Sequence, residues 1–116
     1  MYAEVARESG PVVVFMTAGS QDEANRIART LVEERLAACV NVIPAVQSVF
    51  FWDGKVCEES EFLLVAKSIR SLQKKLEERV KQLHSYQVPE VIVVPIAAGS
   101  KDYLEWVEKS VSGPKP

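Results

Sequence analysis

Long apolar runs are absent from this sequence of 116 residues. The longest apolar stretches, at residues 11–18 and 88–98, are strand-sized and interrupted, whereas a membrane-spanning helix needs about 18 or more consecutive apolar residues. Residues 1–10 carry Glu4, Arg7 and Glu8 and lack the apolar core of a secretory signal. We therefore expect neither a membrane-spanning segment nor a signal peptide.

The chain also has few cysteines and a small net charge. The chain has two cysteines, Cys39 and Cys57, and 47% apolar residues, so it can build a core without disulfides. Free thiols in a reducing compartment fit this usage, and we expect the cytoplasm. With 14 basic and 16 acidic residues the net charge is only -2, which gives no general attraction to nucleic acid or anionic lipid.

Catalytic groups are few. The chain has one histidine, no serine in the strand–turn–helix setting of a hydrolase nucleophile, and no carboxylate pair that the expected topology brings together. We therefore expect no enzymatic activity and assign no catalytic residue.

The pattern that is present predicts alternating strands and helices. We expect strands at 12–17, 39–52 with a break at Pro44, 55–67 and 91–96, and helices from about Ser20 to Arg35, from about Ser68 to His84, and after Ser100. We expect the first strand to be central and buried on both faces. The order β-α-β-β-α-β, followed by a C-terminal helix, predicts an α+β fold, a ferredoxin-like split-βαβ sandwich. It forms one domain over residues 12–111, with flexible tails at 1–11 and 112–116.

The second and third strands should form a long hairpin. Asp53 and Gly54 suit a type I′ turn, and the third strand would extend for roughly 40 Å in a domain whose expected radius of gyration is about 13 Å. Part of the hairpin must then project, and its apolar side chains favour a subunit interface. The alternative is a bulged strand that curls back on its own core. The apolar residues concerned are Val49, Phe50, Phe51, Trp52 and Phe62.

Several separated motifs resemble the CutA divalent-cation tolerance family across residues 12–110. They are LVEERLAACVNVIP at 31–44, Ser48 with WDGK at 52–55, Glu61 with Lys67, HSYQVPE at 84–90, and YLEW at 103–106. The resemblance implies a ferredoxin-like protomer and a homotrimer held by strand pairing between subunits, on a plan shared with PII-type signalling proteins. It also implies weak association with copper, and with other divalent cations such as zinc, that folding does not require.

The resemblance points to His84 and Glu90 as metal ligands, with Met16 and Cys39 as softer donors. Met16 stands where some members carry a cysteine, and its thioether suits Cu(I) better than Zn(II) or Cu(II). His84 and Glu90 are separated by Pro89 and share no helix face, so further ligands must come from across the fold or from another subunit. The structural alternative has His84 closing the second helix, and Met16 and Cys39 as core residues.

A polar cleft between protomers is the second candidate site. Trp52, Glu61, Lys67 and Tyr86 resemble the family's cleft residues, and we expect them to bind a small anion or a hydrated metal. The alternative is a solvated pair of charges on one strand face. Ser85 stands where the family commonly has proline, and this difference predicts a less rigid approach to Tyr86.

Two functions remain in competition. The first is a homotrimeric, copper-binding protein that acts in metal tolerance or the response to metal ions. The alternative is a PII-like sensor of a small ligand, or a scaffold that anchors a partner protein, without a dedicated metal site. Three other uses of this topology are disfavoured, because the chain lacks the paired cysteines of a copper chaperone, the basic third strand of an RNA-recognition domain, and the arginine of a small acyl-phosphate hydrolase after the first strand.

Overall fold

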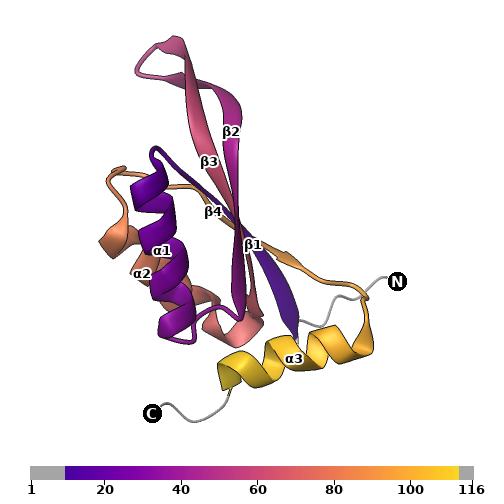
Figure 1. The fold of residues 1–116 in the computed structure, drawn as a ribbon. Helices are drawn as coiled ribbons and strands as arrows, with labels where there is room; N and C mark the ends of the chain where they lie inside the picture. The colour runs from indigo at the N-terminus through magenta and orange to yellow at the C-terminus, as the bar shows by residue number, and fades with distance from the viewer. Residues whose placement is uncertain (1–9, 113–116) are drawn as a thin grey trace.

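The computed structural model describes residues 10–112 and forms an antiparallel four-stranded sheet in the order β2-β3-β1-β4. The strands are β1 (Pro11–Ala18), β2 (Cys39–Trp52), β3 (Lys55–Ile69) and β4 (Val91–Pro95), and the helices are α1 (Gln21–Glu33), α2 (Gln73–Leu83) and α3 (Lys101–Ser112). Helices α1 and α2 lie on one side of the sheet and α3 lies at its lower end (Figure 1). The predicted α+β class and element order are confirmed. Most of the two predicted tails lies outside the described residues.

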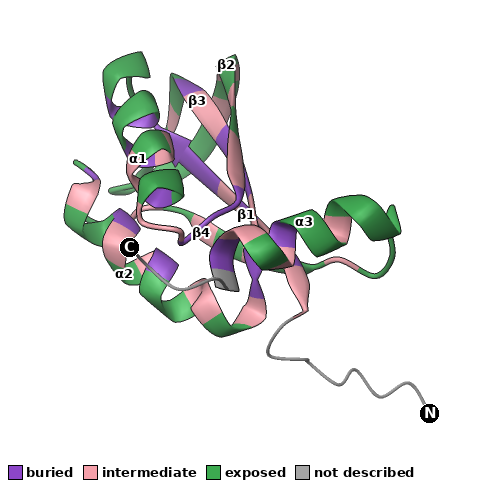
Figure 2. Ribbon diagram, turned by 60° about the horizontal axis from the view of Figure 1, so that its bottom comes forward, coloured by how far each residue is buried: buried purple, intermediate pink, exposed green. Residues whose placement is uncertain are grey.

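Strand β1 is central, as predicted, because it pairs with both β3 and β4. Its alternate residues Val12, Val14 and Met16 are almost completely buried under the helices. Val13 and Phe15, which point to the other side, are only partly covered. Figure 2 shows how buried and less buried residues alternate along the strands. The expectation that both faces of β1 are buried is therefore wrong for one chain, since α1 and α2 cover one face fully, whereas α3 covers only the lower end of the other.

Helix α1 begins where its capping signal predicts. The Ser20 side chain accepts a hydrogen bond from the Glu23 amide at 3.2 Å, which satisfies a donor that the first turn leaves open. Ala24, Ile27 and Leu31 form its buried stripe. The helix ends at Glu33, short of the predicted Arg35, which has a left-handed φ of 59°.

The predicted start of the second helix at about Ser68 is wrong. Ser68 pairs with Val12 and so belongs to β3, and its buried hydroxyl donates to the Leu36 carbonyl at 2.6 Å. A 3-10 turn at Arg70–Leu72 follows before α2 begins at Gln73. Sheet pairing and a buried hydrogen bond thus outweigh the helical spacing of the apolar residues. The predicted end near His84 is confirmed, since this residue caps α2.

The β2–β3 hairpin projects from the body of the molecule, as predicted (Figure 1). Asp53 and Gly54 have φ values of 53° and 78°, the two positive values that a type I′ turn requires. The radius of gyration is 15.1 Å, above the roughly 13 Å of an evenly compact chain of this size. Phe51 and Trp52 near the tip are more than half exposed. Phe62, in contrast, packs against the main core.

Helix α3 closes the lower end of the sheet. The Ser100 hydroxyl accepts a hydrogen bond from the Tyr103 amide, as the capping prediction requires. Val107 and Val111 form a second small core with Ala38 and Ile69. No helix within residues 10–112 is long and apolar enough to cross a membrane.

Candidate functional site

A pocket of about 590 Å³ lies beside the hairpin, between β2, β3 and the segment that joins α2 to β4. Three of its lining side chains are carboxylates, and three more are aromatic. The lining residues are Thr17, Ser48, Val49, Phe50, Trp52, Glu59, Glu61, Tyr86, Gln87, Val88 and Glu90. The volume is within the usual range for small-molecule sites.

The pocket is negatively charged. Glu59, Glu61 and Glu90 all line it, and among the described residues none of the three forms an ion pair with a basic side chain. Burial, and then the negative charge of Glu61, raise the pKa of Glu90. The carboxylates therefore repel one another, and a bound cation would relieve this repulsion.

Glu61 is the most buried of these carboxylates, with 6% of its surface exposed. The Tyr86 hydroxyl donates to Glu61 Oε2 at 2.6 Å. Burial, and then this hydrogen bond, raise the pKa of Tyr86 well above its usual value, so Tyr86 stays protonated and remains a donor. Tyr86 uses one acceptor position of Oε2, so the Glu61 carboxylate keeps acceptor positions on both oxygens for a ligand.

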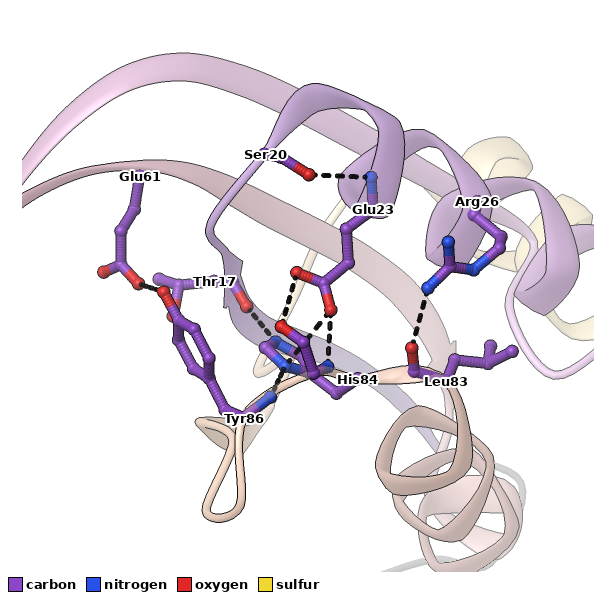
Figure 3. A network of polar contacts seen from close by, with 9 residues as sticks. Thr17, Ser20, Glu23, Arg26, Glu61, Leu83, His84 and Tyr86 are labelled. Carbon is purple, nitrogen blue, oxygen red and sulfur yellow. Dashed lines mark hydrogen bonds and ion pairs between the residues drawn. The ribbon is translucent and has the colours of Figure 1, made fainter.

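Tyr86 is held by a polar network that also includes His84 (Figure 3). His84 Nε2 lies 2.7 Å from the Thr17 carbonyl oxygen, and the Tyr86 amide donates to His84 Nδ1 at 3.0 Å. A carbonyl only accepts and an amide N–H only donates, so Nε2 carries the ring proton and Nδ1 is the acceptor. The alternative in which His84 interacts with the last carbonyls of α2 is therefore wrong for the ring. Arg26 instead donates to the Leu83 carbonyl at 2.9 Å.

Glu23 ties the same segment to α1. Its carboxylate accepts from the Ser85 amide at 2.5 Å and from the Ser85 hydroxyl at 3.2 Å, and it lies 3.6 Å from His84 Nδ1. Burial alone would raise the pKa of Glu23, but the hydrogen bonds from the Ser85 amide and hydroxyl lower it below its usual value. The expectation of a less rigid approach to Tyr86 is not supported by these contacts, because the serine supplies two anchoring donors.

The predicted cleft residues are brought together only in part. Trp52, Glu61 and Tyr86 line the same pocket. Lys67 does not line the pocket, because Lys67 lies six residues, or roughly 20 Å, beyond Glu61 along β3. There its ammonium group donates to the Asn41 side chain. Sequence alternation could have placed Glu59 beside Glu61, since residues two apart share a strand face. Glu23 gave no such signal, because 62 residues separate it from Ser85.

The predicted metal ligands do not meet in one chain. Met16 is completely buried in the core, and both ring nitrogens of His84 are occupied. Cys39 Sγ lies 3.4 Å from the Tyr103 hydroxyl; this contact, and then burial, raise the pKa of Tyr103 to about 12. Among the described residues, no three His, Cys, Asp or Glu side chains are placed to hold one metal ion. Ligation across a subunit boundary stays a prediction.

Comparison with known proteins gives a consistent family. The model of the CutA1 divalent ion tolerance protein family matches residues 12–110. The chain is 48% identical over 98 residues to the Divalent-cation tolerance protein CutA of Thermus thermophilus, covering 84% of this chain and 95% of the relative. It is 46% identical over 99 residues to the chloroplastic Protein CutA of Arabidopsis thaliana, covering 85% of this chain but only 54% of that relative.

A solved structure agrees with these sequence matches. The crystal structure of CutA1 from Oryza sativa superposes with a TM-score of 0.86 and 43% identity, covering 88% of this chain and 94% of the rice chain. Sequence and fold therefore agree over most of the chain. This chain belongs to the CutA1 divalent ion tolerance protein family.

Proposed function

We propose that three copies of this chain assemble into a homotrimer and that the pocket, completed at a boundary between protomers, binds divalent cations weakly, copper first among them. Binding of this kind would serve metal tolerance. The observation that carries the proposal is the set of three pocket carboxylates, Glu59, Glu61 and Glu90, none of which has a basic partner among the described residues.

Assembly is supported by the side of the sheet opposite α1 and α2, which we name the open face. Helix α3 covers only its lower end, near Ile69. Strand register sets its apolar residues in rows: Phe15 is opposite Val65 and Ile92, and Ile43 is opposite Leu63. Ile92 is 51% exposed in the single chain. An apolar surface of this kind is typical of a subunit interface. The open face comprises Val13, Phe15, Ile43, Leu63, Val65, Ile92 and Val94.

Cation binding is supported by the chemistry of the lining. Carboxylate oxygens suit hard divalent cations, and among first-row divalent ions the affinity of a given site generally peaks at Cu(II). Because the chain does not gather three ligands around one point, we expect a hydrated ion with low affinity. A neighbouring protomer would supply any further ligand.

The test is calorimetric titration of the full chain with Cu(II), and separately with Zn(II). Glu90→Gln removes a pocket carboxylate and should weaken Cu(II) binding by about tenfold or more. Glu105→Gln, an exposed carboxylate on α3 away from the pocket, is the matched control and should bind as the wild type does. Equal affinity of the Glu90→Gln variant and the wild type would contradict the assignment of the pocket.

A small-ligand sensor of PII-like type is the second candidate, and the size of the pocket favours it. A volume of about 590 Å³ exceeds what one hydrated ion fills, and the Trp52 and Tyr86 rings offer surfaces for an organic ligand. A thermal-shift screen of small metabolites tests this candidate, because a ligand of the native state raises the melting temperature. Capture of a protein partner without any such shift would favour the scaffold role.

We also propose a cytoplasmic location and a binding role without catalysis. Free thiols at Cys39 and Cys57 fit a reducing compartment. Fractionation of cells that express the full-length protein would test the location.

A further inference from the structure

His84 is fully engaged inside the chain. Its side chain is 0% exposed. Nε2 donates a hydrogen bond to the Thr17 carbonyl, and Nδ1 accepts a hydrogen bond from the Tyr86 amide. A metal ion needs a free nitrogen lone pair, and the only lone pair of the neutral ring is directed at the Tyr86 amide. His84 could bind a metal only after releasing Tyr86.

The neighbouring residue reinforces this hold. Ser85 donates two hydrogen bonds to Glu23, and the backbone bond requires an amide proton, which proline lacks. Glu23 belongs to the first turn of α1, and Thr17 lies in β1. The segment from His84 to Tyr86 is thus fixed to a helix and to a central strand at once (Figure 3).

Tyr86 also fits a tight space. Its ring centroid lies 4.6 Å from that of His84, and a Cβ atom added at Gly19 would lie 3.1 Å from the Tyr86 hydroxyl oxygen. The hydroxyl then reaches Glu61 at 2.6 Å. Four separate features therefore determine where the phenol lies. They are the hydrogen bond from the Tyr86 amide to His84, the contact between the two rings, the absence of a Cβ atom at Gly19, and the acceptor oxygen of Glu61.

We propose that His84 is a positioning residue of the pocket and not a ligand: by holding the Tyr86 amide it keeps the Tyr86 hydroxyl on Glu61 Oε2 and so fixes the orientation in which the Glu61 carboxylate is presented to a cation. Its effect on binding rests on the proposed function of the pocket. Its effect on Tyr86 does not, because that follows from contacts within one chain.

Two variants separate the roles. In His84→Asn the side-chain oxygen can take the place of Nδ1 and accept the Tyr86 amide proton, whereas His84→Ala leaves that donor without an acceptor. We expect His84→Ala to weaken Cu(II) binding in calorimetry by about 10- to 100-fold, the usual effect of removing a group that orients a ligand. His84→Asn should remain within about threefold of the wild type. Equal losses in the two variants would overturn the proposal.

Pulsed electron paramagnetic resonance of Cu(II) bound to the full-length wild-type protein gives a readout that a merely structural role would not change. If His84 only positions Tyr86, the spectrum shows oxygen coordination and no imidazole nitrogen coupling. Imidazole coupling in the wild type that disappears in His84→Asn would overturn the proposal, because His84 is the only histidine of the chain.

A metal-free measurement keeps the two proposals apart. In nitrogen-15 and proton spectra of the full chain without metal, the Tyr86 amide signals should move in His84→Ala, which removes the acceptor, but stay close to wild type in His84→Asn, whose side-chain oxygen can replace it. The Tyr86 ring signals should move in both variants, because each removes the neighbouring imidazole ring. Unchanged Tyr86 amide signals in His84→Ala would overturn the positioning role. Wild-type protein that binds no Cu(II), yet shows the expected Tyr86 shifts, would instead overturn the proposed cation binding and leave the positioning role supported.

Discussion

The two sides of the sheet differ although the same strands make both. Leu64 faces the helices and is 0% exposed, whereas its neighbour Val65 lies on the open face and is only partly covered. Both residues are apolar and both pair with β1. Apolar character in a strand therefore shows that a surface will be covered, but not whether the same chain covers it.

The largest expected effect comes from a charge on the covered face. Leu64→Asp places an unpaired carboxylate in the main core, which should cost about 3–5 kcal/mol or more of the free energy of unfolding. We expect a chain that is mostly unfolded, measured as loss of the helical circular dichroism signal. A native spectrum would show that the main core tolerates a charge, and the proposed difference between the two faces of the sheet would then be wrong.

The matched change on the open face is Val65→Asp. In a single chain this side chain can reach water, so secondary structure should persist, while a charge in the proposed interface should weaken assembly by at least about 100-fold. Sedimentation at micromolar concentration should show a shift towards folded monomer. Wild-type assembly of the variant would exclude the open face as the interface.

A smaller effect is expected at Glu23, which joins the helix layer to the pocket. Glu23→Gln replaces a buried charged acceptor with a neutral one and should lower the free energy of unfolding by about 1.5–3 kcal/mol at pH 7. Since the folded-state pKa of Glu23 is lowered from 4.5, its contribution is full above that value and is lost as the pH falls through the lower folded pKa. Denaturant unfolding from pH 7 down to pH 3 should show a shallower acid decline in the variant.

Glu90 is the internal control for that titration. Its pKa is raised, so ionisation disfavours the folded state, and its stabilising influence is lost as the pH rises through the folded pKa. Glu90→Gln should therefore keep or raise stability at pH 7. A loss equal to that of Glu23→Gln would show that the two carboxylates have the same environment.

The smallest change is expected at the hairpin tip, which neither face covers. Gly54 has φ of 78° and no other atoms within 4 Å of an added Cβ, so Gly54→Ala brings only backbone strain, about 1–2 kcal/mol. Lys55→Ala, one residue further on, should have almost no effect. Chemical denaturation measures both, and equal stability of the Gly54→Ala variant and the wild type would argue against the strained turn.

The order of elements could be predicted because local signals fix it: Ser20 caps α1, Ser100 caps α3, and Asp53 with Gly54 makes the turn. The end of β3 could not, because Ser68 is held there by the Leu36 carbonyl, 32 residues away. Helical spacing of apolar residues carries no information about such a partner.

The site was predictable to a similar degree. Trp52, Glu61 and Tyr86 were found through resemblance to a family, and the structure gathers them in one pocket. Lys67 was expected with them because it shares a strand face with Glu61, but a shared face does not bring residues six apart into contact. The Thr17 carbonyl sets which nitrogen of His84 carries the proton, and a motif of side chains does not show where such a backbone atom lies.

The register shift in β2 has a consequence for aggregation. β2 is an edge strand, and its ladder is interrupted between Ile43 and Val46, where Pro44 lacks an amide proton and Ala45 adopts a φ of 64°. A foreign strand that began to pair along this edge would meet a gap after a few residues and could not extend into a continuous fibril-like ladder. We therefore expect this irregularity to limit the length over which an unrelated strand could pair with β2.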